Sequence, residues 1–157
     1  MNALDVMRYG HDEVLRGFDG LSAGDWARPG VTTRWSPKDT LAHLTSFELL
    51  LEDALKSVLG RGPTPLLDGY RADYAGFGDA QVAARAGRTP EAVMREYTEA
   101  HERVMRLANE LGPERLREPG TIPWYGPGYS LDDLVVYINY AHKREHCGQL
   151  KVFRKRG

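Results

Sequence analysis

The sequence predicts an all-α protein, a four-helix bundle whose helices are joined by long connections. Four stretches carry apolar residues at helical spacing, and segments rich in glycine and proline separate them. No stretch alternates apolar and polar residues as a half-buried strand would. Four amphipathic helices without a sheet can bury their apolar faces only against one another. The length of 157 residues, with 41% apolar and 27% charged residues, indicates a single domain over residues 1–157.

Two of the predicted helices rest mainly on the spacing of their apolar residues. The first spans about residues 2–18, and the third spans residues 89–111 and stops at the Gly-Pro pair 112–113. A long connection, residues 61–88, precedes the third helix, and we expect one short helix in it, around residues 70–86.

The second predicted helix has the clearest start. Ser36 can cap it, Pro37 suits its first turn, and Asp39 completes a capping-box arrangement. The helix continues to about residue 58, where glycines end it. Beside its main apolar stripe lies a second row formed by His43, Phe47, Leu50 and Ala54.

The last predicted helix follows a loop, residues 119–129, that is dense in proline, glycine and aromatic residues. Ser130 can cap it, and Asp132 and Asp133 lie near its positive end. Its stripe advances in steps of three or four residues and consists of Leu131, Val135, Ile138, His142, His146, Gln149 and Phe153. Polar groups therefore occupy positions where a bundle usually buries leucine.

The two histidines of this stripe have the spacing of a metal-binding pair. His142 and His146 are four residues apart, so they share one helix face with their Cβ atoms about 6 Å apart. Burying two imidazoles without partners would cost on the order of 1–3 kcal/mol each. A bound cation would supply the missing partner.

A third histidine reaches a similar depth if the second and last helices run antiparallel with level ends. His43 lies about 10 Å along its helix from Ser36, and the pair lies roughly 12–18 Å from the end near Arg154. Three neutral nitrogens with one open position form the arrangement of catalytic zinc sites. From the pattern alone, a metal site and a set of structural histidines are about equally supported.

Two motifs resemble those of the DinB/YfiT-like superfamily. One is Trp35-Ser-Pro-Lys-Asp-Thr-Leu-Ala-His-Leu44 followed by Phe47-Glu48, and the other is His142-Lys-Arg-Glu-His146-Cys-Gly-Gln149. The resemblance implies a four-helix bundle, often dimeric, with a three-histidine nickel or zinc site, here His43, His142 and His146. It also implies a metal-dependent transferase that uses a low-molecular-weight thiol such as mycothiol or bacillithiol, or a product of a stress-response gene.

Several functions remain open at this point. The alternatives to a thiol-dependent transferase are a metal-dependent hydrolase, a non-catalytic protein that binds a small ligand or metal during stress, and a bundle with a structural metal. A zincin protease is excluded, because Lys143 stands where that motif requires glutamate. No catalytic general base can be assigned, and the expected partners are a small-molecule substrate and a second copy of the chain.

Composition argues against two classes of partner. The formal net charge of −1 gives no strong positive field for nucleic acid, and no apolar run approaches the roughly 20 residues of a membrane span. Cys147 is the single cysteine, so no internal disulfide is possible, which favours a cytoplasmic protein.

Other polar and aromatic residues have two interpretations each. Glu48 can orient a metal ligand or lie at the bundle edge, and Gln149 can hydrogen-bond the site, although a structural role is favoured. His11 is expected to be a core histidine with a hydrogen-bond partner, His101 to be half-exposed, and Cys147 to be a packing residue. The remaining candidates are expected to plug the bundle end (Trp124, Tyr125, Tyr129) and to form a solvated helix end (Lys151, Arg154, Lys155, Arg156).

Overall fold

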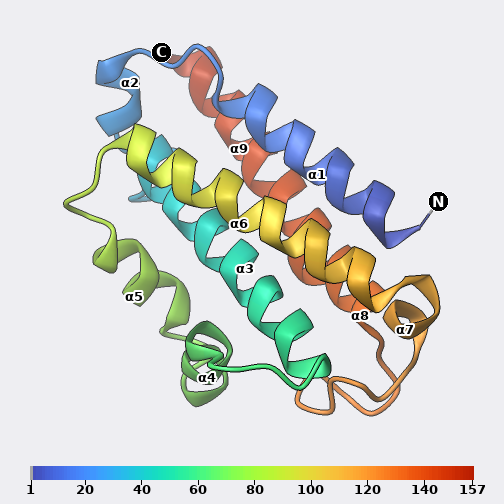
Figure 1. The fold of residues 1–157 in the computed structure, drawn as a ribbon. Coiled ribbons are helices and arrows are strands. Elements are labelled where there is room, and N and C mark those ends of the chain that lie inside the picture. Colours follow the sequence, from blue (N-terminus) through green and yellow to red (C-terminus); the bar gives the residue numbers. More distant parts are fainter. Residues whose placement is uncertain (1) are drawn as a thin grey trace.

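The computed structural model describes residues 2–157, and no strand occurs in that range. Four long helical segments pack side by side (Figure 1). They are α1 (Ala3–Phe18), α3 (Pro37–Val58), α6 (Pro90–Leu111), and a C-terminal segment made of α8 (Leu131–Leu134), the π-helix η1 (Val135–Tyr140) and α9 (Ala141–Arg156). The predicted all-α bundle is confirmed.

The helices that carry the three histidines run antiparallel, as their assembly at one depth requires. In Figure 1, α3 and α6 run one way, whereas α1 and α9 run the other way. Helices α3 and α9 are therefore antiparallel. Both predicted capped starts are present: Ser36 with Asp39 begins α3, and Ser130 with Asp133 begins α8, each as a reciprocal capping box.

The connection between α3 and α6 contains two short helices, α4 (Pro65–Ala72) and α5 (Phe77–Ala84), where one helix over residues 70–86 was predicted. Both pack on α3. The Asp53 carboxylate of α3 accepts the backbone N–H groups of Leu66 and Leu67, at 2.7 and 3.2 Å, and so caps α4 from outside the segment. This long-range cap was not readable from local sequence.

Two further short helices occupy segments that were expected to be irregular. Helix α2 (Ala23–Ala27) passes through Gly24 because the Ser22 side chain caps it at the Asp25 N–H, 3.1 Å away. Helix α7 (Pro113–Arg117) begins at the proline that follows α6. Proline suits the first helical turn, so the same residue can follow one helix and start the next.

The C-terminal segment departs from the single regular stripe that the sequence predicted. Val135 is buried as expected, but the next buried positions are Asn139 and Lys143, whereas Ile138 and His142 are only partly buried. The π-helix has i→i+5 hydrogen bonds, so its wide turn adds one residue to the step between buried positions. The inward face of α9 is thereby shifted toward Lys143, Cys147 and Leu150, while His146 and Phe153 of the predicted stripe stay buried.

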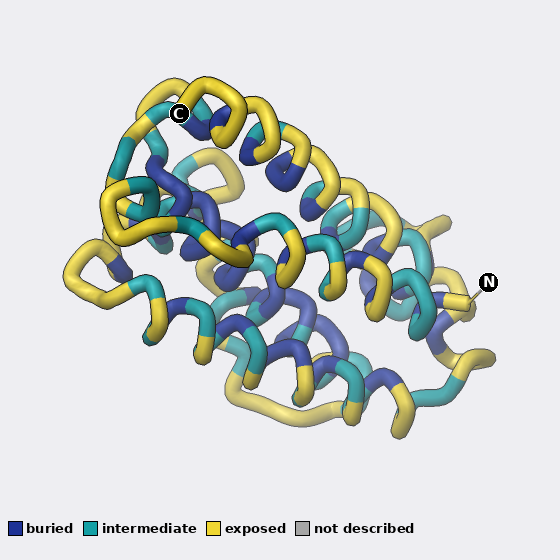
Figure 2. Tube along the Cα trace, turned by 90° about the horizontal axis from the view of Figure 1, so that it is seen from above, coloured by how far each residue is buried: buried dark blue, intermediate teal, exposed yellow. Residues whose placement is uncertain are grey.

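Buried residues line the inner sides of the long helices (Figure 2). They form two apolar clusters, one around Met7, Leu55 and Val104 and the other around Val14, Leu41 and Tyr97. None of the helices within residues 2–157 has both the length and the apolar character required to cross a membrane.

Candidate metal centre

Three histidines from two helices converge where α3 meets α9. The Nε2 atom of His142 lies 2.7 Å from Nε2 of His43 and 3.1 Å from Nε2 of His146. His43 and His146 are each 8% exposed, and His142 is partly buried. One ligand nitrogen from each of the three rings lies within 4.8 Å of the other two, so a single cation can reach all three.

The donor set suits a divalent cation. Zinc binds imidazole nitrogen at about 2.0–2.1 Å, so tetrahedral ligands lie roughly 3.3 Å from one another. The observed nitrogen separations of 2.7 and 3.1 Å are a few tenths shorter, and a small outward shift of the rings makes room for an ion. The cluster can hold a metal ion with three protein ligands.

Gln149 fixes one of the three rings. Its Oε1 lies 2.7 Å from Nδ1 of His146, and because an amide oxygen only accepts, Nδ1 must donate. The Nε2 lone pair of His146 is then directed at the shared position. Gln149 thus contacts a candidate ligand directly, which differs from the structural role that the sequence favoured for it.

Aromatic side chains surround the rings. The Trp35 ring lies 4.7 Å from that of His43, and the Phe47 ring lies 5.0 Å from His43 and 4.5 Å from His142. Burial, reinforced by the neighbouring imidazoles, lowers the pKa of His43 to about 4 and the pKa of His142 to about 3. Both rings are neutral at pH 7, which is the form that binds metal.

Helix α5 packs over the His43 ring at Gly78. A Cβ atom added to Gly78 would lie 3.3 Å from both Cε1 and Nδ1 of that ring, so a side chain here would press on it. The row of His43 and Phe47 could be predicted from the sequence. The approach of Gly78 could not, because it depends on how the connection after α3 folds back onto that helix.

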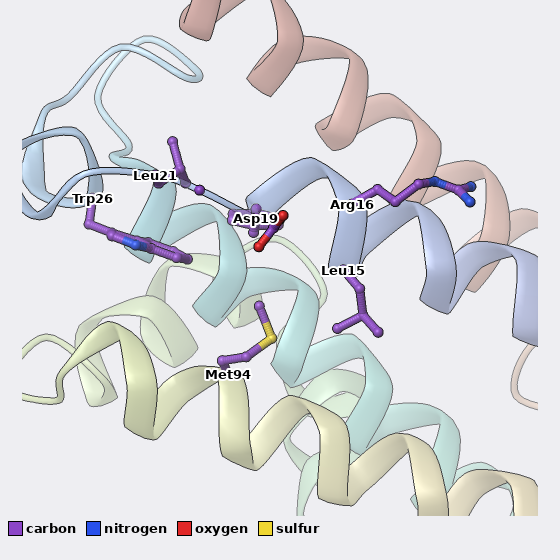
Figure 3. A pocket seen from close by; sticks show the side chains of 8 residues that line it. Leu15, Arg16, Asp19, Leu21, Trp26 and Met94 are labelled. Atoms are coloured by element: carbon purple, nitrogen blue, oxygen red, sulfur yellow. The ribbon is translucent and has the colours of Figure 1, made fainter.

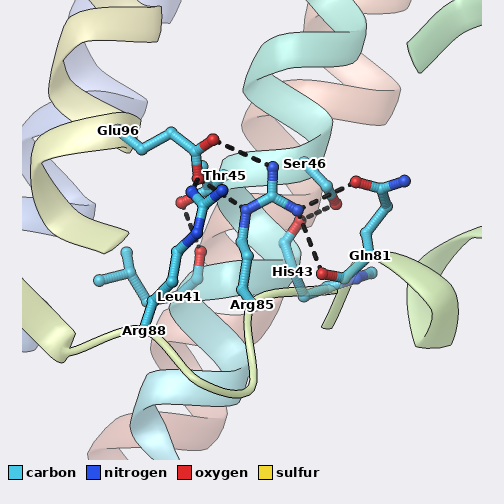
Figure 4. A network of polar contacts seen from close by, with 8 residues as sticks. All are labelled: Leu41, His43, Thr45, Ser46, Gln81, Arg85, Arg88 and Glu96. Atoms are coloured by element: carbon cyan, nitrogen blue, oxygen red, sulfur yellow. Dashed lines mark hydrogen bonds and ion pairs between the residues drawn. The ribbon is translucent and has the colours of Figure 1, made fainter. Parts of the chain in front are cut away.

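A buried arginine anchors α5 in this position (Figure 4). The Arg85 guanidinium donates to both carboxylate oxygens of Glu96 on α6, at 2.6 and 3.2 Å, and to the Gln81 side chain, at 2.9 Å. Arg85 is only 5% exposed. Its bidentate pair with Glu96 ties the end of α5 to α6, which helps to keep Gly78 against the histidine.

Two predictions for polar residues are wrong. His101 is 7% exposed instead of half-exposed, and Glu48 is fully buried instead of lying at the edge. Glu48 does not hydrogen-bond a candidate ligand directly either, because its oxygens pair with Lys143, His101 and Asn139. The shifted face of α9 brings Lys143 to Glu48.

Two other predictions are confirmed, one of them in part. His11 has the expected hydrogen-bond partner, since its Nδ1 lies 3.3 Å from the Tyr97 hydroxyl, but it is partly buried and not a core residue. Cys147 is a packing residue, 2% exposed, and burial raises the pKa of its thiol to about 11.

The loop and the chain end also have defined places. Trp124 and Tyr125 pack against the apolar cluster around Leu55, as expected for residues that plug the bundle end, whereas Tyr129 is exposed. The basic C-terminal residues are exposed, but Arg154 also donates to the carbonyls of Gly17 and Asp19, both at 2.8 Å.

A surface groove of about 570 Å³ lies between α1, α2 and α6 (Figure 3). Its lining includes the apolar side chains of Leu15, Trp26 and Met94 and the charged side chains of Arg16 and Asp19. None of the converging histidines lines this groove. The candidate metal site at the α3–α9 contact is therefore separate from this cavity.

The fold and the site define an all-α helical bundle with a three-histidine cluster between antiparallel helices. The chain belongs to the DinB superfamily, whose family model matches residues 7–150. No curated protein and no solved structure matched the chain.

Proposed function

We propose that this protein binds one divalent metal ion through His43, His142 and His146. The convergence of three Nε2 atoms supports the proposal most directly, with separations of 2.7 and 3.1 Å. The lowered pKa values of His43 and His142 and the hydrogen bond from His146 to Gln149 all favour neutral rings with free Nε2 lone pairs. Zinc and nickel are the metals that the family resemblance favours.

We further propose that the site serves a transferase reaction that uses a low-molecular-weight thiol. A cation held by three neutral imidazoles supplies Lewis acidity, which lowers the pKa of a thiol or water that it binds. The protein's own Cys147 is a poor nucleophile, because its buried thiol has a pKa of about 11. The attacking sulfur must therefore come from a separate molecule, as the relationship to thiol-dependent family members suggests.

Metal analysis of tag-free protein tests the binding proposal. We expect equimolar zinc or nickel in the wild type and loss of metal in His43→Ala, His142→Ala and His146→Ala. His11→Ala is the matched control, since it removes a partly buried imidazole outside the cluster. Equal metal content in all variants would refute the assignment of the ligands.

Turnover of a model electrophile tests the reaction. With a bacillithiol- or mycothiol-type thiol, the wild type should form the thioether faster than His146→Ala. Stoichiometric uptake of the thiol or electrophile without product would instead favour a non-catalytic binding protein. The expected homodimer stays a prediction, which sedimentation velocity can check.

A further inference from the structure

A second polar cluster crosses the bundle interior beside the histidines. Glu48 is 0% exposed and Lys143 is 1% exposed, and Lys143 Nζ lies 2.7 Å from Glu48 Oε2. Asn139 Nδ2 donates to the same oxygen at 2.9 Å, and His101 Nδ1 lies 3.3 Å from Oε1. Residues from α3, α6, η1 and α9 thus meet at one carboxylate, which we call the Glu48 cluster.

Helix α1 leaves space for the lysine. A Cβ atom added to Gly10 would lie 3.2 Å from Lys143 Cδ and 3.3 Å from Tyr140 Cδ2. Gly10 is inside α1, where glycine is unfavourable compared with alanine. Glycine at position 10 leaves room for the aliphatic part of the Lys143 side chain, which passes across it.

The same lysine directly follows a candidate metal ligand. Lys143 comes one residue after His142, and successive residues of an α-helix differ by about 100° around its axis. When Lys143 points to Glu48, His142 is held at the α3–α9 contact, where its Nε2 meets that of His43 at 2.7 Å. The orientation of α9 about its own axis therefore fixes both contacts together.

The apolar stripe of this helix would favour another orientation. Regular helix through residues 135–140 would direct Ile138 and His142 into the interior, as their spacing from Val135 predicts. The structure instead has the π-helix η1, which places Asn139 and Lys143 there. In the regular register Glu48 would be buried without Lys143, and an unpaired buried carboxylate is strongly disfavoured.

We propose that Glu48 and Lys143 are positioning residues: their buried ion pair selects the π register of the last helix and so brings His142 and His146 to His43. Neither the Glu48 carboxylate nor the Lys143 ammonium group contacts a candidate metal ligand. The inference rests on the proposed metal site for its effect on affinity, but the register itself exists without metal.

The decisive variant is the double substitution Glu48→Gln with Lys143→Met. It removes both charges together, keeps similar side-chain volumes, and leaves an amide oxygen as an acceptor, so no buried charge is left unpaired. Replacing a buried ion pair by neutral groups often preserves stability, which separates positioning from folding. Thermal unfolding and far-UV circular dichroism establish that the variant is folded.

Two measurements then test the register. In the metal-free wild type, ring protons of His43 and His142 should show nuclear Overhauser contacts, because the ring centroids are 4.6 Å apart. The double variant should lose these contacts. It should also bind Co²⁺ about 10- to 100-fold more weakly, with a changed visible d–d spectrum.

Gly10→Ala provides a second route that leaves both charges in place. The added methyl group would lie 3.2 Å from Lys143 Cδ, so the lysine side chain must shift by a few tenths of an ångström. This shift should loosen the contact with Glu48 and weaken Co²⁺ binding, although Gly10 lies on a different helix from every candidate ligand. Gly17→Ala is the matched control. It adds the same methyl group on α1 facing α9, but at an ordinary 3.5 Å from Cys147 Sγ, and it should leave the affinity unchanged.

The outcomes separate the two proposals. Ring contacts and Co²⁺ affinity that remain at wild-type values in the double variant and in Gly10→Ala would overturn the positioning role. A wild type that binds no Co²⁺ would overturn the metal site, and loss of the ring contacts in the double variant would still support the register.

Discussion

The histidine cluster and the Glu48 cluster place polar groups in the same bundle in opposite ways. Both carboxylate oxygens of Glu48 have protein partners from other helices. The histidines instead direct their Nε2 atoms at one another, and within residues 2–157 Nδ1 of His43 and of His142 has no partner. Polar groups of opposite character, such as Glu48 and Lys143, pair with each other and hold helices together. Imidazole nitrogens whose lone pairs converge on one position require a further ligand, such as a cation, between them.

The pKa values follow the same difference. Burial and the neighbouring imidazoles keep His43 and His142 neutral, with pKa values of about 4 and 3. Burial alone would raise the pKa of Glu48, but Lys143 and the hydrogen bonds lower it to about 2. The histidine cluster is therefore a set of neutral imidazoles, and the Glu48 cluster contains a buried ion pair.

The largest expected effect comes from breaking the charge pair on one side only. Lys143→Met leaves Glu48 buried and without its cation, which should lower the free energy of unfolding of the metal-free protein by about 3–5 kcal/mol. Urea denaturation measures this loss. Arg103→Met is the control, because the Arg103–Glu52 pair is partly exposed and should contribute about 0–1 kcal/mol. Similar losses in the two variants would contradict the special status of the Glu48 cluster.

Metal should stabilise the protein only through the histidines. At a free Zn²⁺ concentration about 1,000-fold above the dissociation constant, the linkage relation predicts about 4 kcal/mol of added stability. His43→Ala should abolish most of this gain, whereas His11→Ala should retain it. Differential scanning calorimetry with and without Zn²⁺ makes the comparison, and an equal gain in His43→Ala would place the ion elsewhere.

Acid should affect the two clusters in different pH ranges in the metal-free protein. The unfolded chain protonates His43 and His142 near the ordinary pKa of 6.5, but the folded protein does so only near 4 and 3, so stability falls as the pH drops below about 6.5. The lowered pKa of Glu48 stabilises the fold above its ordinary value of 4.5, and this contribution disappears as the pH falls toward 2.

Variants can separate these two ranges in urea titrations from pH 7 downward. His43→Ala should reduce the loss between about pH 6.5 and 4, whereas the double variant Glu48→Gln with Lys143→Met should remove the loss below about 4.5. If His43→Ala leaves the upper range unchanged, the histidine is not protonated differently in the folded and unfolded states.

The smallest expected effect is a refinement of ligand geometry. Gln149→Leu removes the acceptor at 2.7 Å from His146 Nδ1, so the ring loses its preferred tautomer and orientation. Metal affinity should fall about 10- to 100-fold with little change in the stability of the metal-free protein. Isothermal titration with Zn²⁺ measures this, and unchanged affinity would assign Gln149 to the structural role first expected for it.

Much of the fold was predictable because its signals are local. Ser36 and Ser130 mark two helix starts through contacts three residues along, and the resulting capping boxes are present. The three candidate ligands were also predictable, since a pair four residues apart shares a face and antiparallel helices bring His43 to the same depth. The four long helical segments follow from this same kind of information.

The errors fall where long-range contacts override local spacing. The stripe through Ile138 and His142 predicted a regular helix, but the π-helix places Asn139 and Lys143 inside. The burial of His101 was missed because its partner Glu48 lies on another helix, 53 residues away in the sequence. The start of α4 depends in the same way on Asp53 of α3.

By itself, the sequence determined the four long helical segments, the capped starts at Ser36 and Ser130 and the three histidines, because periodicity and capping involve residues close along the chain. Tertiary structure alone decided which face of α9 turns inward and which ring nitrogens meet. The physical reason is the cost of burying charge: a carboxylate on α3 needs a cation from another helix, and only the folded bundle brings Lys143 to Glu48.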